Sequence, residues 1–180
     1  MRVIAGSARG VSLRAPKDRA TRPITDRVKE TLFAILGDRV PDARVLDLYA
    51  GSGAIGIEAL SRGAPSADLV ERGRTAVEAI RANLSSTRLA DDARVHEADV
   101  ESYLAASGDG PWDLVVLDPP YEVRAIVAPL RSVVPHLAAG AVVVVKHFWR
   151  TEVPGVDHLV PIRQRRFGET MLTFLEMEDA

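Results

Sequence analysis

The sequence predicts an α/β fold: a Rossmann-like, doubly wound sheet that is mostly parallel and carries helices on both faces. From Arg44 onward, short apolar stretches alternate with longer amphipathic ones, which indicates strands alternating with helices. The apolar run from Ala141 to Val145 lacks in/out alternation, as is typical of parallel strands covered on both sides. A glycine-rich stretch from Gly51 to Gly56 follows the first strand and begins a helix, which is the context of a nucleotide-binding turn.

The alternating part of the chain divides into elements by its apolar runs. Strands are predicted near 44–49, 67–71, 93–97, 112–118 and 140–146, and helices near 53–63, 73–88, 99–106 and 125–135. Two further strands, near 156–163 and 169–177, are joined by a short link from Arg165 to Glu169, which implies an antiparallel hairpin at the sheet edge. The prediction is a seven-stranded sheet, parallel except for this C-terminal hairpin.

The N-terminal part is predicted to be a small extension made of a hairpin and a helix. Residues 2–5 and 10–14 have the pattern of two short β segments. Thr25 is the predicted N-cap of a helix that ends near Gly37, because apolar residues between Val28 and Leu36 share one helical face.

Composition excludes several classes of site. The 180 residues include no cysteine, which rules out disulfides, thiolate nucleophiles and cysteine-bound zinc. The histidines are scattered without metal-binding spacing, so we expect no metal site. No apolar stretch is long enough to span a bilayer and the N-terminus lacks an apolar signal segment, so we expect a cytoplasmic protein with no membrane partner.

Charge is distributed unevenly along the chain. The formal net charge is −2, yet residues 1–29 hold eight Lys or Arg against two Asp, a net charge of +6 that leaves −8 for the rest. A basic segment on an acidic body indicates a localised contact with a polyanion, and a solvated arm without a partner is the alternative. The candidate phosphate contacts are Arg9, Arg22 and Arg27, and a second basic cluster contains Arg163, Arg165 and Arg166.

Carboxylates are predicted at the ends of three successive strands, beside the glycine-rich turn. Asp47 and Glu71 end the first two strands, and Asp99 follows the third. Glu71 lies where a carboxylate can hold a ribose diol, and Asp99 can accept a hydrogen bond from adenine or simply cap the next helix. Asp47 would repel the pyrophosphate of NAD but attract the ammonium and sulfonium of S-adenosylmethionine (SAM), so the charge favours SAM.

The stretch Asp118-Pro119-Pro120-Tyr121 follows another buried strand and offers a second set of acceptors. Proline has no N–H, so backbone carbonyls stand as pure acceptors beside the Asp118 carboxylate, and Tyr121 can stack on a planar group. Such a site favours the exocyclic amino group of a nucleobase or a side-chain amide. Taken alone, a Pro-Pro pair that ends a strand and begins a turn is an equally good interpretation.

Together, the Asp47-x-x-Ala50-Gly51-Ser52-Gly53 and Asp118-Pro119-Pro120-Tyr121 motifs resemble class I SAM-dependent amino-methyltransferases. Three further stretches resemble the bacterial RsmD family, which methylates guanine N2 in 16S ribosomal RNA (rRNA). They are Arg2 to Gly10, Arg22 to Phe33 and Phe167 to Thr170, of which the second is the most specific. One departure is Gly73, where family members often carry a second acidic residue.

This resemblance implies a function and a role for each motif residue. The chain is expected to transfer a methyl group from SAM to guanine N2 of 16S rRNA or of the assembling small subunit, acting as a monomer. Residues 1–24 would contact the RNA, and residues 25–180 would form the methyltransferase domain. The cofactor would be held by Asp47, Ala50, Gly51, Ser52 and Gly53 at its methionine part, by Glu71 at the ribose and by Asp99 at the adenine. The target amino group would be held by Asp118 and the Pro119 carbonyl, with Pro120 beside them and Tyr121 against the base.

Other functions remain open at this point. An adenine-N6 DNA or RNA methyltransferase would use the same acceptor site. A glutamine-amide methyltransferase more often shows Asn in place of Asp118. An NAD-dependent oxidoreductase is disfavoured by Asp47, and an RNA-binding accessory protein is disfavoured by the intact motifs.

Overall fold

The computed structural model describes residues 1–16, 24–119 and 124–178. Its sheet has seven strands in the order β3-β2-β1-β4-β5-β7-β6. The strands are β1 (Arg44–Leu48), β2 (Ser66–Glu71), β3 (Ala93–Glu97), β4 (Trp112–Leu117), β5 (Leu137–Phe148), β6 (Leu159–Phe167) and β7 (Thr170–Met177). The helices are α1 (Asp26–Leu36), α2 (Ala54–Ser61), α3 (Arg74–Thr87), α4 (Val100–Ala106) and α5 (Arg124–Val133). The predicted α/β fold with a C-terminal antiparallel hairpin is confirmed.

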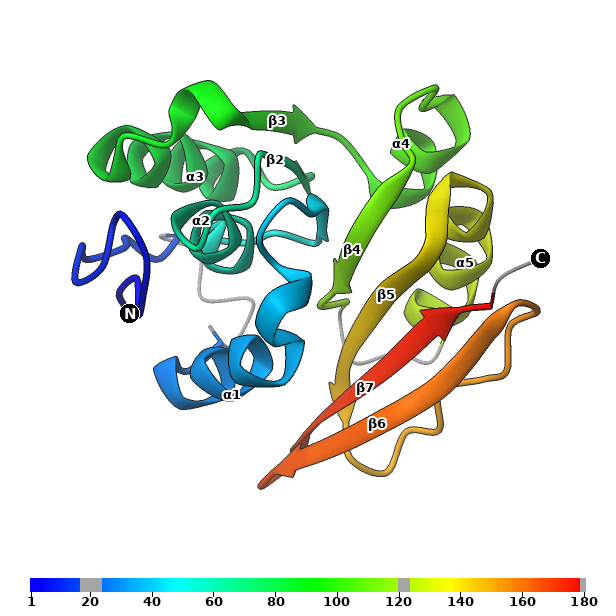
Figure 1. Ribbon diagram of the computed structural model, residues 1–180. Helices are drawn as coiled ribbons and strands as arrows, with labels where there is room; N and C mark the ends of the chain where they lie inside the picture. Colours follow the sequence, from blue (N-terminus) through cyan, green and yellow to red (C-terminus); the bar gives the residue numbers. More distant parts are fainter. Residues whose placement is uncertain (17–23, 120–123, 179–180) are drawn as a thin grey trace.

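Helices lie on both faces of the sheet (Figure 1). Successive residues of β1 enter different cores: Val45 belongs to the core that holds Ile57 of α2, whereas Leu46 belongs to the core that holds Leu130 of α5. A strand whose two faces are both covered has no polar side, which explains the unbroken apolar runs in the sequence.

The strand order reverses at the centre of the sheet, between β1 and β4. The chain runs outward from β1 to β3 and then returns to place β4 on the other side of β1. Leu48 pairs with Leu117 in parallel register, so Tyr49 and Asp118 leave the sheet side by side. Open α/β sheets bind their ligands at such a reversal, beyond the carboxyl ends of the strands.

The C-terminal hairpin differs in detail from the prediction. Strand β6 extends to Phe167, so Arg165 and Arg166 lie in the strand and the predicted link from Arg165 to Glu169 is wrong. The turn consists of Gly168 and Glu169, and Gly168 adopts a φ of +58° that glycine tolerates without strain. The sequence predicts a loop at the charged residues Arg165 and Arg166 because β6 is an edge strand, and an exposed edge strand can carry the same polar residues as a loop.

The N-terminal extension packs against the side of the sheet that carries α2 and α3. Its predicted hairpin is present as an antiparallel bridge between Arg2 and Ser12. Val3, Ala8 and Leu13 enter the same core as α2, so the extension is part of the folded body. The domain boundary at residue 24 stays a prediction. Within the part of the chain that the structure describes, no helix is both long and apolar enough to cross a membrane.

A buried ion pair joins the extension to α1 and α2. Lys29 Nζ lies 3.0 Å from Glu58 Oε2, and neither side chain is exposed to solvent. The Glu58 carboxylate also accepts hydrogen bonds from the backbone N–H groups of Ile4 and Ala5, at 2.8 and 3.0 Å, and from Arg62 Nε at 2.8 Å. Lys29 in turn donates to the Arg2 carbonyl at 2.6 Å. Because buried charges must be paired and hydrogen-bonded, this network holds the extension in place.

Candidate active site

The glycine-rich turn between β1 and α2 has the backbone conformation that its sequence requires. Gly51 and Gly53 have φ values of +57° and +75°, in the left-handed region where glycine is favoured. A Cβ at Gly53 would also lie 3.1 Å from Leu69 Cδ2, a tighter contact than most Cβ atoms make. The turn therefore needs glycine for both its conformation and its close approach to β2.

Asp47 and Glu71 bind the backbone of this turn with their carboxylates. Asp47 Oδ2 accepts a hydrogen bond from the Gly56 N–H at 3.0 Å. Glu71 Oε2 accepts from the Gly51 N–H at 2.9 Å, and its Oε1 accepts from the Gly73 N–H at 2.8 Å. The N–H groups of Gly51 and Gly56, at the turn where a pyrophosphate would bind, are thus already bonded to carboxylates. The local charge is also negative. This arrangement disfavours a dinucleotide and favours a cationic ligand.

Asp47 is the buried centre of this negative charge. Burial raises the pKa of Asp47 to about 7, which the hydrogen bond from Gly56 opposes and the nearby charges of Asp118 and Glu71 reinforce. A cation placed among these three carboxylates would relieve their repulsion. The amino acid part of SAM, with its ammonium and sulfonium, meets this requirement.

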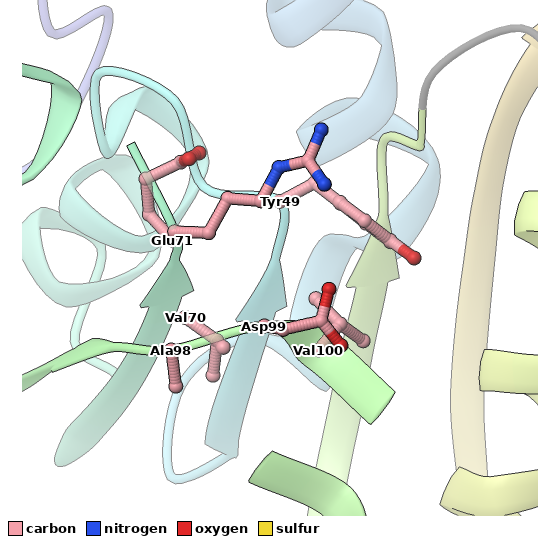
Figure 2. A pocket seen from close by; sticks show the side chains of 7 residues that line it. Tyr49, Val70, Glu71, Ala98, Asp99 and Val100 are labelled. Carbon is pink, nitrogen blue, oxygen red and sulfur yellow. The ribbon is translucent and has the colours of Figure 1, made fainter. Parts of the chain in front are cut away.

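A small, shallow pocket opens beside Glu71 (Figure 2). Its walls are apolar at Val70, Ala98 and Val100, and carboxylates stand at its rim. Apolar walls beside carboxylates offer the chemistry that a planar ring bearing amino protons would meet, so adenine is the part of the cofactor that this pocket suits. The remaining lining residues are Tyr49, Glu71, Arg72 and Asp99.

Asp99 is the N-cap of α4, which is one of the two roles that the sequence predicts for it; the other is binding adenine. Its Oδ1 accepts hydrogen bonds from the Glu101 and Ser102 N–H groups at 3.0 and 3.4 Å. A carboxylate offers about four acceptor positions, so the cap leaves acceptor capacity for a ligand amino group at the pocket rim. The role of Asp99 toward adenine stays a prediction.

Sequence reasoning missed Tyr49. This residue has a φ of +62°, an uncommon value for a large side chain, at the point where β1 ends. Burial raises the pKa of the Tyr49 hydroxyl to about 12, and the charges of Glu101 and Asp99 act in the same direction. Its ring forms part of the pocket next to Asp99 (Figure 2). The one available signal was its position directly before the glycine turn.

Asp118 lies at the end of β4 and pairs with a lysine that sequence reasoning also missed. Lys146 Nζ donates to both carboxylate oxygens of Asp118, at 2.7 and 2.6 Å. The Lys146 side chain is 7% exposed and that of Asp118 is 25% exposed. Burial raises the pKa of Asp118, and the charge and hydrogen bonds of Lys146 oppose this rise. A lone charged residue closing the apolar run from Ala141 to Val145 was a signal that could have identified Lys146.

The other predicted site residues are placed as follows. Ala50, Ser52 and Pro119 are buried at the ends of β1 and β4. The carbonyl of Ser52 accepts a hydrogen bond from Asn83 Nδ2 of α3 at 2.9 Å, and Asn83 also bonds Arg14 of the extension. Pro120, Tyr121 and Arg22 lie outside the described residues.

Two of the three candidate phosphate contacts, Arg9 and Arg27, lie within the described residues. Exposed Arg27 lies in the first turn of α1, whose Asp26 accepts a hydrogen bond from the Arg2 N–H at 3.4 Å. Met1 Sδ lies 3.8 Å from Ser52 Oγ, so the first residue of the extension reaches the glycine turn. Arg9 follows Ala8, which bonds Ser61 at the opposite end of α2, about 12 Å along the helix.

A cationic and aromatic cluster occupies the tip of the C-terminal hairpin. The guanidinium carbons of Arg166 and Arg150 lie 3.7 and 4.7 Å from the centre of the Trp149 ring. Phe148 of β5 pairs with Thr170 of β7, which places this tip at the carboxyl ends of the parallel strands, on the same edge of the sheet as Asp118.

Comparison with known proteins agrees with this geometry. The family model described as "Conserved hypothetical protein 95" matches residues 1–176. The chain is 38% identical over 175 residues to the "Putative rRNA methyltransferase YlbH" of Bacillus subtilis, which covers 94% of this chain and 95% of that relative. It is 44% identical over 121 residues to the "Ribosomal RNA small subunit methyltransferase D" of Escherichia coli, which covers 67% of this chain and 60% of that relative.

A solved structure shares the whole fold. The "Putative methyltransferase yhhF" from Escherichia coli superposes with a TM-score of 0.86 at 34% identity, covering 100% of this chain and 99% of that one. The resemblance inferred from the two motifs and the class I methyltransferase fold are therefore both confirmed. This chain belongs to the RsmD family of SAM-dependent rRNA methyltransferases, the family that the matching model describes as conserved hypothetical protein 95.

Proposed function

We propose that this chain transfers a methyl group from SAM to the exocyclic N2 of a guanine in 16S rRNA of the small ribosomal subunit. We further propose that it acts as a cytoplasmic monomer. The observation that carries the proposal is the partly exposed Asp118 carboxylate, which leaves the sheet beside Tyr49 at the centre of the strand-order reversal. The Escherichia coli relative, named a small subunit methyltransferase, supports the choice of substrate.

The cofactor would lie across the ends of β1, β2 and β3. Asp47 would face its cationic methionine part, together with the turn residues Ala50, Gly51, Ser52 and Gly53. Glu71 would hold the ribose, because its position at the pocket rim leaves acceptor capacity beyond its two backbone bonds. Asp99 and the apolar pocket walls would hold the adenine. When bound, SAM supplies an electrophilic methyl group on its sulfonium.

Asp118 would hold and activate the amino group that receives the methyl. The lone pair of guanine N2 is delocalised into the ring, which makes the nitrogen a weak nucleophile. Hydrogen bonds from its amino protons to Asp118 and to the Pro119 carbonyl would favour a pyramidal nitrogen with its lone pair directed at the methyl group. The carboxylate would then stabilise the positive charge that develops on nitrogen and accept the released proton. Tyr121 would lie against the base.

The base must leave its stack to reach this site. Guanine N2 lies in the minor groove of an RNA helix, so a looped or flipped nucleotide is required. Phosphate contacts from Arg9, Arg22 and Arg27 would hold the RNA meanwhile. Arg9, near Ser61 at the end of α2 away from the glycine turn, would contact RNA at a distance from the target nucleotide.

The decisive experiment identifies the methylated nucleoside. The purified protein is incubated with methyl-labelled SAM and, in parallel, with small ribosomal subunits, naked 16S rRNA or DNA, and the nucleic acid is digested to nucleosides. Label in N2-methylguanosine, absent with an Asp118→Ala variant, supports the proposal. Label only in N6-methyladenosine would replace it with the adenine-N6 alternative, and label in neither product would contradict both.

A further inference from the structure

Lys146 is the charged group that the structure brings against Asp118. Leu117 of β4 pairs with Val145 of β5 in parallel register, so the next residues of the two strands, Asp118 and Lys146, are neighbours. The ammonium bridges both carboxylate oxygens at 2.6 and 2.7 Å. This contact restrains the plane of the carboxylate and places a positive charge beside it, because one ammonium donates to both oxygens.

The burial of the pair is asymmetric. The Lys146 side chain is 7% exposed, whereas that of Asp118 is 25% exposed and keeps part of its surface toward solvent. With about four acceptor positions on the carboxylate, two hydrogen bonds from Lys146 leave room for the two protons of an amino group from the open side. Lys146 therefore supports Asp118 from behind without filling the position of the substrate.

Among the residues that the structure describes, the neighbouring groups Asp47 and His147 do not supply this support. Asp47, on neighbouring β1, is negative when ionised and repels Asp118. His147, the next residue of β5, is turned to Thr173 Oγ1 and the Phe148 carbonyl, at 2.8 and 2.9 Å. Burial lowers the pKa of His147, which keeps its ring neutral near pH 7. The positive charge at this carboxylate comes from β5 through Lys146.

We propose that Lys146 is a positioning residue that keeps Asp118 ionised and aims its free acceptor positions at the amino group of the substrate. This inference rests on the proposed role of Asp118. It predicts that a neutral residue at 146 impairs transfer mainly at low pH, since the uncompensated burial of Asp118 then favours its protonated form. A cation beside a carboxylate typically lowers its pKa by about 1–3 units, so removing it should raise the pKa of Asp118 by a comparable amount.

The test compares Lys146→Met, Lys146→Gln and Lys146→Arg. In the Met and Gln variants the acidic limb of kcat/KM should move up by about 1–3 pH units, while Arg, which keeps the charge, should leave it near the wild-type position. Lys29→Met is the matched control, because it also removes a buried, ion-paired ammonium but one distant from Asp118. Its acidic limb should not move. SAM affinity, measured by calorimetry, should stay within a few fold in all three Lys146 variants.

A second measurement separates Asp118 from Asp47, which also titrates near neutral pH. The carboxyl carbon of Asp118 is followed by NMR in protein without substrate, assigned by its disappearance in Asp118→Asn, and should titrate at higher pH in Lys146→Met or Lys146→Gln. An unchanged titration in both neutral variants would overturn the inference. Transfer faster than wild type at pH 7 would also overturn it, because Lys146 would then be competing with the substrate. If Asp118→Asn itself retains full activity, the proposed function of Asp118 fails instead.

Discussion

Within the described residues, two buried lysines pair with carboxylates, and the pairs differ in how completely the carboxylate is satisfied. At Lys29–Glu58 both side chains are fully buried, and Glu58 accepts two further backbone N–H groups and Arg62. At Lys146–Asp118 the lysine bonds both oxygens, yet a quarter of the aspartate side chain remains exposed.

The difference separates a structural ion pair from a functional one. Four donors use the acceptor capacity of Glu58, so this pair can only hold segments of the chain together. The Asp118 carboxylate is held on one side and open on the other, which is what a group that must bind an incoming amino group requires. We therefore expect the first pair to affect stability and the second to affect activity.

The largest effect is expected at Asp118. Replacing it with Asn keeps the shape but removes the charge that stabilises the reacting nitrogen, so kcat/KM should fall by about 10²–10⁴-fold. The free energy of unfolding should change far less, and SAM affinity should stay within a few fold. Single-turnover assays with rRNA measure the first quantity and calorimetry the last. Loss of SAM binding would show that Asp118 belongs to the cofactor site.

Replacing Lys29 should mainly lower the stability of the protein, whereas replacing Asp118 should mainly lower its activity. Lys29→Met leaves Glu58 buried with fewer partners, which should cost about 3–5 kcal/mol of unfolding free energy, at the lower end if Arg62 compensates. Urea unfolding followed by circular dichroism measures this change. The double variant Lys29→Met/Glu58→Gln should be destabilised by less than the sum of its single changes, because the unpaired charge is gone. A cost below about 1 kcal/mol would remove the distinction between the two pairs.

Asp47 should link cofactor binding to pH. Its pKa is raised from 3.8 to about 7, so the free protein holds a proton there that a cationic cofactor must displace. SAM affinity should therefore rise by up to about tenfold per pH unit below pH 7 and level off above it. Calorimetry from pH 5.5 to 8.5 tests this against Asp47→Asn, in which the dependence should be flatter. A wild-type affinity independent of pH would contradict the proposed contact.

Asp47 should also make the stability of the protein depend on pH. Because the folded protein binds a proton at Asp47 more tightly than the unfolded chain does, the stability of the cofactor-free protein should fall as pH rises from about 4 to 7. Asp47→Asn should weaken this fall. Thermal unfolding over this pH range provides the measurement, and an Asp68→Asn variant, at a carboxylate away from the site, serves as a comparison.

The smallest effects are expected from the surface arginines. Arg27→Glu should weaken RNA binding and lower the slope of log affinity against log salt by about 0.7–0.9 for each phosphate that the variant no longer neutralises. Arg166→Glu tests the cluster around Trp149, on the sheet edge that also carries Asp118. Arg9→Glu makes the same test near the end of α2 that lies away from the glycine turn. Filter binding at several salt concentrations provides these slopes, and unchanged slopes would place the RNA elsewhere.

Much of this site could be predicted because its signals are local. Asp47 and the glycine turn are close in sequence, and a strand, a turn and a helix in that order leave few possible arrangements. Glu71 is predicted at the end of the second strand, where the structure has it, although its bonds to Gly51 and Gly73 have no signature in the sequence. The hairpin link is predicted wrongly because charged residues on an exposed edge strand have the same composition as a loop.

By itself, the sequence determined the order of strands and helices, the doubly wound fold, the glycine turn and the carboxylates at the strand ends. These follow from apolar periodicity and from residues a few positions apart. Only the tertiary structure decided that Lys146 meets Asp118 across 28 residues and that Arg9 lies near the end of α2 away from the glycine turn. It also decided that Lys29 and Glu58 fix the N-terminal extension. Such contacts depend on strand register and on how helices pack over the sheet, which no local pattern along the chain contains.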